Sequence, residues 1–234
     1  MKVLSVIIPA YNEAAFIGEL LKKVTQVDTE RLGFSKEIIV IDDGSSDDTA
    51  LIVEQSNLAL FFKQENLGKG AAVRNGIARS TGDFIIIQDA DLEYDPEDYL
   101  PMLEALNGQE NISVYGSRVM GHGFLGKKHK DQGFGQWAAG RILTLWAFLL
   151  FGRWITDTLT AYKLYPAKIL QTFHLCTSGF ETDHEITCKL LRSGVDIVEV
   201  PIDYIPRSVE EGKKIRPVDG VIAMWTFLKF RFLA

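Results

Sequence analysis

Two aspartates, Asp89 and Asp91, directly follow a short apolar run within residues 83–95, DFIIIQDADLEYD. The run Phe84–Ile87 predicts a strand buried on both faces, so the aspartates lie just beyond its carboxyl end. Ligands of open α/β sheets bind at that end of the strands. Two carboxylates so close in sequence can bind a hard divalent cation, which in turn can hold a diphosphate. Acidic residues after a strand are also common as solvated turn formers, so the spacing alone leaves both interpretations open.

Strands and helices alternate through the first half of the chain. The expected strands cover residues 3–8, 37–41, 58–62, 84–87 and 112–116, and the expected helices cover about 13–27, 51–53, 71–79 and 96–106. Pro9 is expected to end the first strand, and Asn12 is the expected N-cap of the first helix. Alternation at a spacing of roughly thirty residues predicts an α/β fold with a mainly parallel sheet and helices on both faces.

Polar residues gather where these strands end. The clusters are Tyr11-Asn12-Glu13, Asp42-Asp43, Asp89–Asp91 and Ser117-Arg118. Because the carboxyl ends of parallel strands meet at one edge of a sheet, we expect the clusters to line one cleft, which favours a binding site over turn formers. Asp42 and Asp43 can accept hydrogen bonds from a base or a ribose. Asp89 and Asp91 can hold Mg²⁺ or Mn²⁺ between two phosphates, with Glu93 as a third ligand.

The sequence argues against several other classes of protein. The first strand–helix turn, residues 9–13, lacks a G-x-G-x-x-G motif, which disfavours a dinucleotide-dependent dehydrogenase, and no P-loop motif occurs. The four histidines are scattered, so no zinc site is expected. Two cysteines without metal-ligand spacing indicate a reduced, cytoplasmic protein. The net charge of −6 argues against nonspecific nucleic-acid binding. No signal peptide is recognisable, and no apolar stretch reaches the ~18 residues of a membrane span.

The second half of the chain is organised differently. We expect a glycine-rich loop at 121–135, an extended segment at 156–165, a strand at 195–200, an irregular segment at 203–216, and helices at 136–151, 182–192 and 217–232. The first and last of these helices carry Trp146 and Trp225 near basic residues, which is typical of elements that lie at a membrane surface. Core packing or a homodimer face explains both helices almost as well.

Several ordered motifs resemble a known family. SVIIPAYNE, IDDGSSDDT, NLGKGAAVRNG and DADLEYDPED resemble the family 2 glycosyltransferases, which have the GT-A fold. GSR, TDTLTAYKLY, SGFETDHEI and VPIDYIPRSVEEGKKIRPVDG resemble the polyprenyl-phosphate sugar synthases within it, a group that includes dolichyl-phosphate mannose synthases and glucosyltransferases. The resemblance covers nearly the whole chain. It implies one domain, with a nucleotide-sugar and metal half at 1–118, an acceptor half at 119–216 and an amphipathic C-terminal helix at 217–234.

The resemblance also implies roles for individual residues. Those that would bind the nucleotide-sugar are Pro9, Tyr11, Glu13, Asp42, Asp43, Lys69, Asp89, Arg118 and Lys213. Those that would bind the metal are Asp89, Asp91 and Glu93, and those that would act in catalysis are Asp91, Arg118, Asp183 and Arg207. For Lys69, a phosphate-facing role competes with the explanation that the glycines beside it only start a helix.

The implied reaction is the inverting, metal-dependent transfer of a hexose from UDP-glucose or GDP-mannose to dolichyl or undecaprenyl phosphate. A lipid monophosphate is already an anion near neutral pH, so it needs placement and cationic cover rather than a strong base. Residues that could supply this cover are Arg118, Arg207 and Lys213 or Lys214, and candidates for an acid or base are Asp157, Asp183 and Glu185. The pattern at 211–215 departs from the mannose synthases and favours a glucosyltransferase-like donor.

Other functions remain open at this stage. A family 2 glycosyltransferase with a saccharide or other non-lipid acceptor is the main alternative. A nucleotide-sugar-binding regulator and a sugar nucleotidyltransferase are further alternatives. With a lipid acceptor, the protein would be cytoplasmic and peripheral on the inner face of the membrane, and it could act as a homo-oligomer or with a membrane-anchoring partner.

Overall fold

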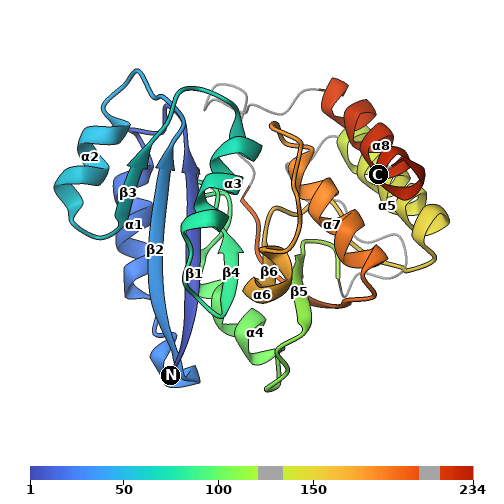
Figure 1. Ribbon diagram of the computed structural model, residues 1–234, viewed down its shortest axis with the longest axis horizontal. Coiled ribbons are helices and arrows are strands. Elements are labelled where there is room, and N and C mark those ends of the chain that lie inside the picture. Colours follow the sequence, from blue (N-terminus) through green and yellow to red (C-terminus); the bar gives the residue numbers. More distant parts are fainter. Residues whose placement is uncertain (121–133, 206–216, 234) are drawn as a thin grey trace.

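A computed structural model describes residues 1–120, 134–205 and 217–233 of the protein. Its described strands form one seven-stranded sheet in the order β3-β2-β1-β4-β6-β5-β7 (Figure 1). The strands are β1 (Lys2–Ala10), β2 (Phe34–Asp42), β3 (Leu60–Lys63), β4 (Phe84–Ile87), β5 (Ile112–Ser117), β6 (Lys163–Pro166) and β7 (Asp196–Pro201). The expected α/β architecture with a mainly parallel sheet is therefore confirmed.

Strand β6 is the exception to the parallel pairing. It lies between β4 and β5 and is antiparallel to both, with Phe84 opposite Pro166 and Val114 opposite Leu164. The neighbouring pairs β1–β2, β2–β3, β1–β4 and β5–β7 are parallel. The expected extended segment 156–165 is only partly a strand, because β6 begins at Lys163.

Helices cover both faces of the sheet, as expected. They are α1 (Ile17–Gln26), α2 (Thr49–Ser56), α3 (Lys69–Arg79), α4 (Tyr99–Glu104), α5 (Phe134–Phe151), α6 (Ala167–Leu170), α7 (Thr182–Arg192) and α8 (Pro217–Phe232), with short 3₁₀ turns η1 (Glu30–Leu32) and η2 (Pro96–Asp98). Helices α5 and α8 lie side by side at the end of the molecule farthest from α2 (Figure 1). No helix within the described residues is long and apolar enough to cross a bilayer.

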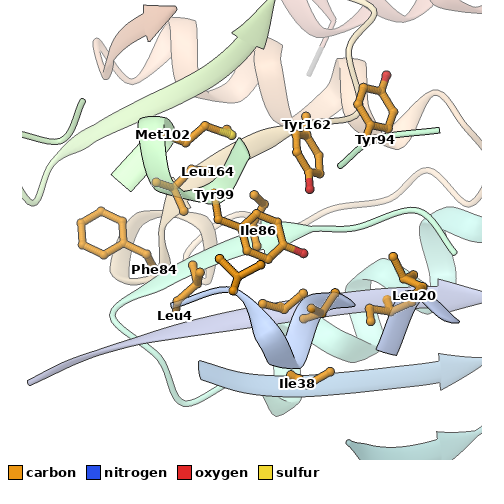
Figure 2. Close-up of a cluster of buried hydrophobic side chains, with 14 of the residues drawn as sticks. Leu4, Leu20, Ile38, Phe84, Ile86, Tyr94, Tyr99, Met102, Tyr162 and Leu164 are labelled. Carbon is orange, nitrogen blue, oxygen red and sulfur yellow. The ribbon is translucent and has the colours of Figure 1, made fainter. Parts of the chain in front are cut away.

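Two apolar cores lie on opposite faces of the sheet because side chains alternate along each strand. Val6 belongs to the core beneath α1 and α4, whereas its neighbour Ile7 belongs to the core beneath α3 and α7. Figure 2 shows part of the first core, where Leu4 and Ile86 from adjacent strands lie near Tyr99. The two cores hold the central strands in place. The strands in turn position the loops that follow their carboxyl ends.

The start of α1 differs from the expectation. The helix begins at Ile17 rather than near residue 13, and Asn12 is not its N-cap. Asn12 has a left-handed backbone (φ 53°), and its side-chain oxygen accepts a hydrogen bond from the Ser46 backbone N–H at 2.8 Å. The Asn12 side chain thus holds the loop after β2 instead of capping a helix.

Pro9 does not end β1, which continues to Ala10. Strand β4 stops at Ile87, opposite Ile7, so β1 has a strand partner on one side only beyond that point. A proline is tolerated there because its missing N–H removes no bond to β4.

Candidate functional site

Most predicted site residues of the first half lie at or just beyond the carboxyl ends of β1, β2 and β4, which are neighbours in the sheet. Lys69 instead begins α3, and Arg118 follows β5. Tyr11 is 38% exposed at this edge, whereas Glu13 is buried. The Glu13 backbone N–H donates to Thr49 Oγ1 at 2.8 Å, which ties the loop after β1 to the start of α2. The sheet therefore brings these loops together, as expected.

Asp42 and Asp43 are both buried and differ in how their carboxylates are used. Asp43 accepts hydrogen bonds from Gln64 Nε2 at 2.6 Å and from the backbone N–H groups of Leu67 and Gly68 at 3.0 and 2.8 Å. It therefore shapes the turn before α3, a structural role that the sequence did not reveal. Asp42 Oδ1 accepts from the Ser45 N–H, and its Oδ2 is buried with no hydrogen-bond partner among the described residues.

Close packing requires glycine at positions 68 and 70. Neither a phosphate-facing Lys69 nor the start of a helix, the two explanations considered from the sequence, includes this requirement. A Cβ atom at Gly68 would overlap the Ser178 carbonyl, and one at Gly70 would overlap Thr182 Oγ1. The Gly70 N–H also donates to the Ser178 carbonyl at 2.7 Å. The turn that carries Lys69 is thus pressed against the segment that leads into α7.

Lys69 contacts site residues from both halves of the chain, Asp89 after β4 and Asp183 in α7. Its ammonium lies 2.7 Å from Asp89 Oδ1 and 3.7 Å from Asp183 Oδ2, and the three side chains are 16%, 21% and 15% exposed, respectively. It also lies over the Phe180 ring, 5.5 Å from the ring centroid. Burial acts to lower the pKa of Lys69, but the charges of Asp89 and Asp183 outweigh it, so the pKa is raised and the ammonium stays charged.

The carboxylates predicted to bind metal do not gather as a set of three. Asp91 Oδ1 accepts from the Glu93 N–H at 3.1 Å, while the Glu93 carboxylate accepts from the Tyr204 hydroxyl at 2.8 Å. No group of three His, Cys, Asp or Glu side chains that could hold a metal ion occurs within the described ranges. Asp89 and Asp91 still fit Mg²⁺ or Mn²⁺, since one or two carboxylates suffice when a diphosphate supplies further oxygens.

Tyr204 connects the loop after β4 with Arg118. It forms a backbone bridge with Tyr94, and the Arg118 guanidinium lies 4.9 Å from the centroid of its ring. Sequence reasoning missed Tyr204. The only signal was its place in a motif shared with polyprenyl-phosphate sugar synthases.

Arg118 and Asp157 form a bidentate ion pair. Arg118 Nε and Nη2 donate to the two carboxylate oxygens of Asp157 at 2.7 and 2.9 Å, and the Arg118 backbone N–H donates at 3.2 Å. Asp157 is 2% exposed. Burial acts to raise its pKa, but the Arg118 charge and hydrogen bonds outweigh that effect and hold the pKa below its usual value. Such a carboxylate is poorly suited to act as an acid or base.

Asp183 and Glu185 both lie in α7, yet only Asp183 faces the site. Glu185 is fully buried and accepts hydrogen bonds from the backbone N–H groups of Cys176 and Thr177 and from the Thr177 hydroxyl. It also pairs with Lys189 at 2.9 Å. Glu185 therefore shapes the loop before α7, which leaves Asp183, beside Lys69, as the carboxylate of α7 at the site.

Lys163 is a buried cation that the sequence reading missed. It lies on β6 with no exposed surface, and its ammonium is 3.4 Å from the Thr158 carbonyl and 3.5 Å from the Asp183 carbonyl. Burial lowers its pKa. Its signal was a lysine within the otherwise apolar run of 161–165. Three other predicted residues, Arg207, Lys213 and Lys214, lie outside the described residues.

Comparisons with known proteins show the family and the fold of the chain. A sequence model described as Glycosyl transferase family 2 matches residues 5–173. The dolichyl-phosphate beta-glucosyltransferase of Dictyostelium discoideum is 29% identical over an alignment that covers 98% of this chain and 75% of the relative.

Solved structures share the fold at low sequence identity. Glucosyl-3-phosphoglycerate synthase from Mycobacterium tuberculosis, in complex with Mn²⁺, UDP and glucosyl-3-phosphoglycerate, has a TM-score of 0.67 and 20% identity, covering 98% of this chain and 80% of that one. Mannosyl-3-phosphoglycerate synthase from Rubrobacter xylanophilus has a TM-score of 0.71 and 17% identity, covering 98% and 72%. The GT-A fold expected from the motifs is thus confirmed.

Proposed function

The chain belongs to glycosyl transferase family 2, and from this we propose that it transfers a hexose from a nucleotide-sugar to a polyprenyl phosphate, with inversion at the sugar. The choice of a phosphate acceptor rests on one observation. Each of the three carboxylates that could act as a catalytic base already has a partner within the protein. Asp157 is held by Arg118, Glu185 is held by the loop before α7, and Asp183 lies beside Lys69. An acceptor that arrives as an anion, as a phosphate monoester does, needs no base.

Asp89 and Asp91 are proposed to hold Mg²⁺ or Mn²⁺ together with the donor diphosphate. When bound, the metal would neutralise the charge of the departing nucleoside diphosphate. Lys69 would contribute to the same neutralisation, and Tyr11, which is 38% exposed, is proposed to contact the nucleoside. The metal found with UDP in the solved glucosyl-3-phosphoglycerate synthase supports this assignment.

For the donor we propose UDP-glucose, with GDP-mannose as the alternative. The supporting observations are the likeness to the Dictyostelium dolichyl-phosphate beta-glucosyltransferase and the departure of residues 211–215 from the mannose synthase pattern. Arg118 is proposed to orient the acceptor phosphate. Its guanidinium stays fixed by Asp157 while its side chain keeps 23% exposure.

We further propose that α5 and α8 contact the inner face of the cytoplasmic membrane. The exposed apolar side chains of these helices include Ile142, Leu145, Leu149, Val221, Trp225 and Phe232, which are 57%, 48%, 66%, 67%, 56% and 67% exposed. The helices are held together by the Trp146 indole, which donates to the Met224 carbonyl at 3.1 Å. Lys229 and Arg231 in the last turn of α8 add the cationic side chains that anionic lipid surfaces attract.

A donor and acceptor screen tests the reaction. Release of nucleoside diphosphate is measured with UDP-glucose or GDP-mannose, undecaprenyl or dolichyl phosphate, and Mn²⁺ or Mg²⁺. We expect release from UDP-glucose only when lipid phosphate and metal are both present, and a loss of at least about a hundredfold in Asp91→Ala. Asp196→Ala, at a 70% exposed aspartate on β7, is the matched control and should be fully active.

Two outcomes would contradict parts of the proposed reaction, one the metal assignment and the other the lipid acceptor. Full activity in Asp91→Ala would remove the metal assignment. Release with a saccharide, but not with lipid phosphate, would favour the saccharide acceptor. That acceptor must lose a proton, so Asp183→Ala should then abolish turnover, whereas with a phosphate acceptor the same change should be milder.

Membrane contact is tested by co-sedimentation with vesicles of neutral and of anionic phospholipids. Trp225→Ala and Leu149→Ser should weaken binding, most strongly on anionic vesicles. Leu60→Ser is the control, since Leu60 is 52% exposed but lies on the edge strand β3. If the α5 and α8 variants change the size of the protein in solution and not its vesicle binding, the helices form a contact between copies instead.

A further inference from the structure

We propose that the Lys69 ammonium pairs with Asp89 in the place of the divalent cation before metal and donor bind. In this view, Lys69 holds Asp89 until the donor arrives, and it then releases Asp89 to the metal while it moves to the diphosphate and Asp183. The inference deepens the proposed function and rests on its metal site. Lys69 would thus couple the binding of the metal to the binding of the nucleotide.

The Lys69 ammonium already contacts both carboxylates between which it would move, Asp89 and Asp183. The short contact of 2.7 Å to Asp89 Oδ1 occupies an oxygen that the metal would need. The longer contact of 3.7 Å to Asp183 Oδ2 shows a second carboxylate within reach of a small side-chain rotation. Asp183 is not one of the proposed metal ligands, so it can hold the displaced ammonium.

The backbone around Lys69 is fixed, so the side chain alone would move. Gly68 and Gly70 lie against Ser178 and Thr182 without room for a Cβ atom, and the Gly70 N–H is bonded to the Ser178 carbonyl. A lysine carries a point charge on a flexible stem, and it can exchange partners without a fixed geometry. A rotation about the bonds of its stem is enough to bring the ammonium to Asp183 or to an incoming phosphate.

Competition between two cations for Asp89 has a consequence for affinity. A metal ion that arrives alone must displace the ammonium and remain close to it, which costs electrostatic energy. A nucleoside diphosphate brings negative charge that both cations can share. Metal and nucleotide should therefore strengthen each other's binding, and the coupling must be the same in both directions.

The test measures Mn²⁺ binding from the electron paramagnetic resonance signal of free Mn²⁺, with and without UDP. No sugar or lipid is needed. In Lys69→Met, we expect Mn²⁺ alone to bind roughly tenfold more tightly than in the wild type, because the competing charge is gone. The strengthening of Mn²⁺ binding by UDP should shrink by a similar factor. Lys69→Gln serves as a second variant, and thermal melting checks that both are folded.

Two controls separate competition at Asp89 from a general change in charge. Lys69→Arg keeps the cation and should keep weak binding of Mn²⁺ alone. Lys63→Met removes an exposed cation from the end of β3 and should behave as the wild type. Unchanged or weaker binding of Mn²⁺ alone in both folded Lys69 variants would overturn the inference, as would an equal gain in Lys63→Met.

The Mn²⁺ binding experiment and the donor and acceptor screen can fail independently of each other. If the protein does not use polyprenyl phosphate but Lys69→Met still binds Mn²⁺ more tightly, the inference stands and the acceptor is wrong. If neither the wild type nor the Lys69 variants bind Mn²⁺, even with UDP, then the metal site and the inference both fail.

Discussion

The pairs Lys69–Asp89 and Arg118–Asp157 both join a cation to a carboxylate at the carboxyl edge of the sheet. In the first pair the lysine has a second carboxylate nearby, and every member of the cluster retains some exposure to solvent. In the second pair two donors of one guanidinium meet two oxygens of one carboxylate, and Asp157 is nearly inaccessible.

The difference follows from the chemistry of the two cations. A guanidinium is planar and matches a carboxylate in one fixed geometry, whereas an ammonium is a point charge that can exchange partners. The arginine pair therefore suits a permanent part of the scaffold, and the lysine pair suits a contact that opens during the reaction.

Asp157→Ala should have the largest effect. Removing a buried carboxylate leaves the Arg118 charge uncompensated, so we expect the free energy of unfolding to fall by about 3–5 kcal/mol. Urea denaturation at neutral pH measures it. The control is Asp196→Ala, which breaks the Arg153–Asp196 pair at an aspartate that is 70% exposed and should cost less than about 1 kcal/mol. Equal losses in the two variants would mean that the Arg118 pair is not structural.

As the pH falls, we expect the loss of stability to begin with His184 rather than with Asp157. Because the pKa of Asp157 is held low, the arginine pair should persist in mild acid. His184, buried against Phe227, has a pKa lowered from 6.5 to about 3, chiefly by burial and also by the charges of Lys163 and Lys69. The native imidazole stays neutral while the unfolded one takes up a proton below pH 6.5, so stability is lost as the pH falls through that value.

The contribution of His184 to this loss between pH 6.5 and about pH 5 is roughly 1.5 kcal/mol. Measuring the urea midpoint at several pH values gives the slope. His184→Phe keeps an aromatic ring against Phe227 and removes this titrating group, so it should lose roughly 1.5 kcal/mol less than the wild type across this window. Other groups, such as Asp98, whose pKa burial raises to about 6, titrate alike in both proteins. A variant that kept the wild-type slope would show that another group carries the pH dependence.

Lys69→Met should have the smallest effect on stability, within about 1 kcal/mol. Its carboxylates are 21% and 15% exposed and can be hydrated when the ammonium is gone. The same denaturation experiment measures it beside Asp157→Ala. A loss as large as that of Asp157→Ala would mean that the lysine pair is also part of the scaffold, and the contrast between the pairs would collapse.

The parts of the fold that could be predicted are those set by local patterns. The run Phe84–Ile87 was recognisable as a buried strand because four apolar residues lie between polar ones, and Asp89 and Asp91 were placed at its end for the same reason. The contact of Lys69 with Asp89 could not be predicted, since it depends on where the turn before α3 meets the end of β4. Sequence spacing carries no information on that approach.

Side chains whose hydrogen-bond partner is distant in the sequence were the hardest to place. Asn12 has the residue type of an N-cap, but its oxygen is used by Ser46 on another loop. Glu93 has the spacing of a metal ligand, and its carboxylate also accepts a hydrogen bond from the Tyr204 hydroxyl, a partner from the second half of the chain that the sequence did not show. A polar residue type shows that a hydrogen bond is required, and only the tertiary structure shows which group provides it.

The antiparallel strand β6 also determines when the sheet can be completed during synthesis. The outer edge of β4 pairs with β6, with Phe84 opposite Pro166, so the first four strands leave the ribosome with an open, apolar edge. An unpaired edge of this kind invites pairing between chains, and it stays open until residues far along the chain have emerged. The second half of the chain, which supplies β6, therefore also protects the first four strands from aggregation, and premature termination between β5 and β6 would leave that edge uncovered.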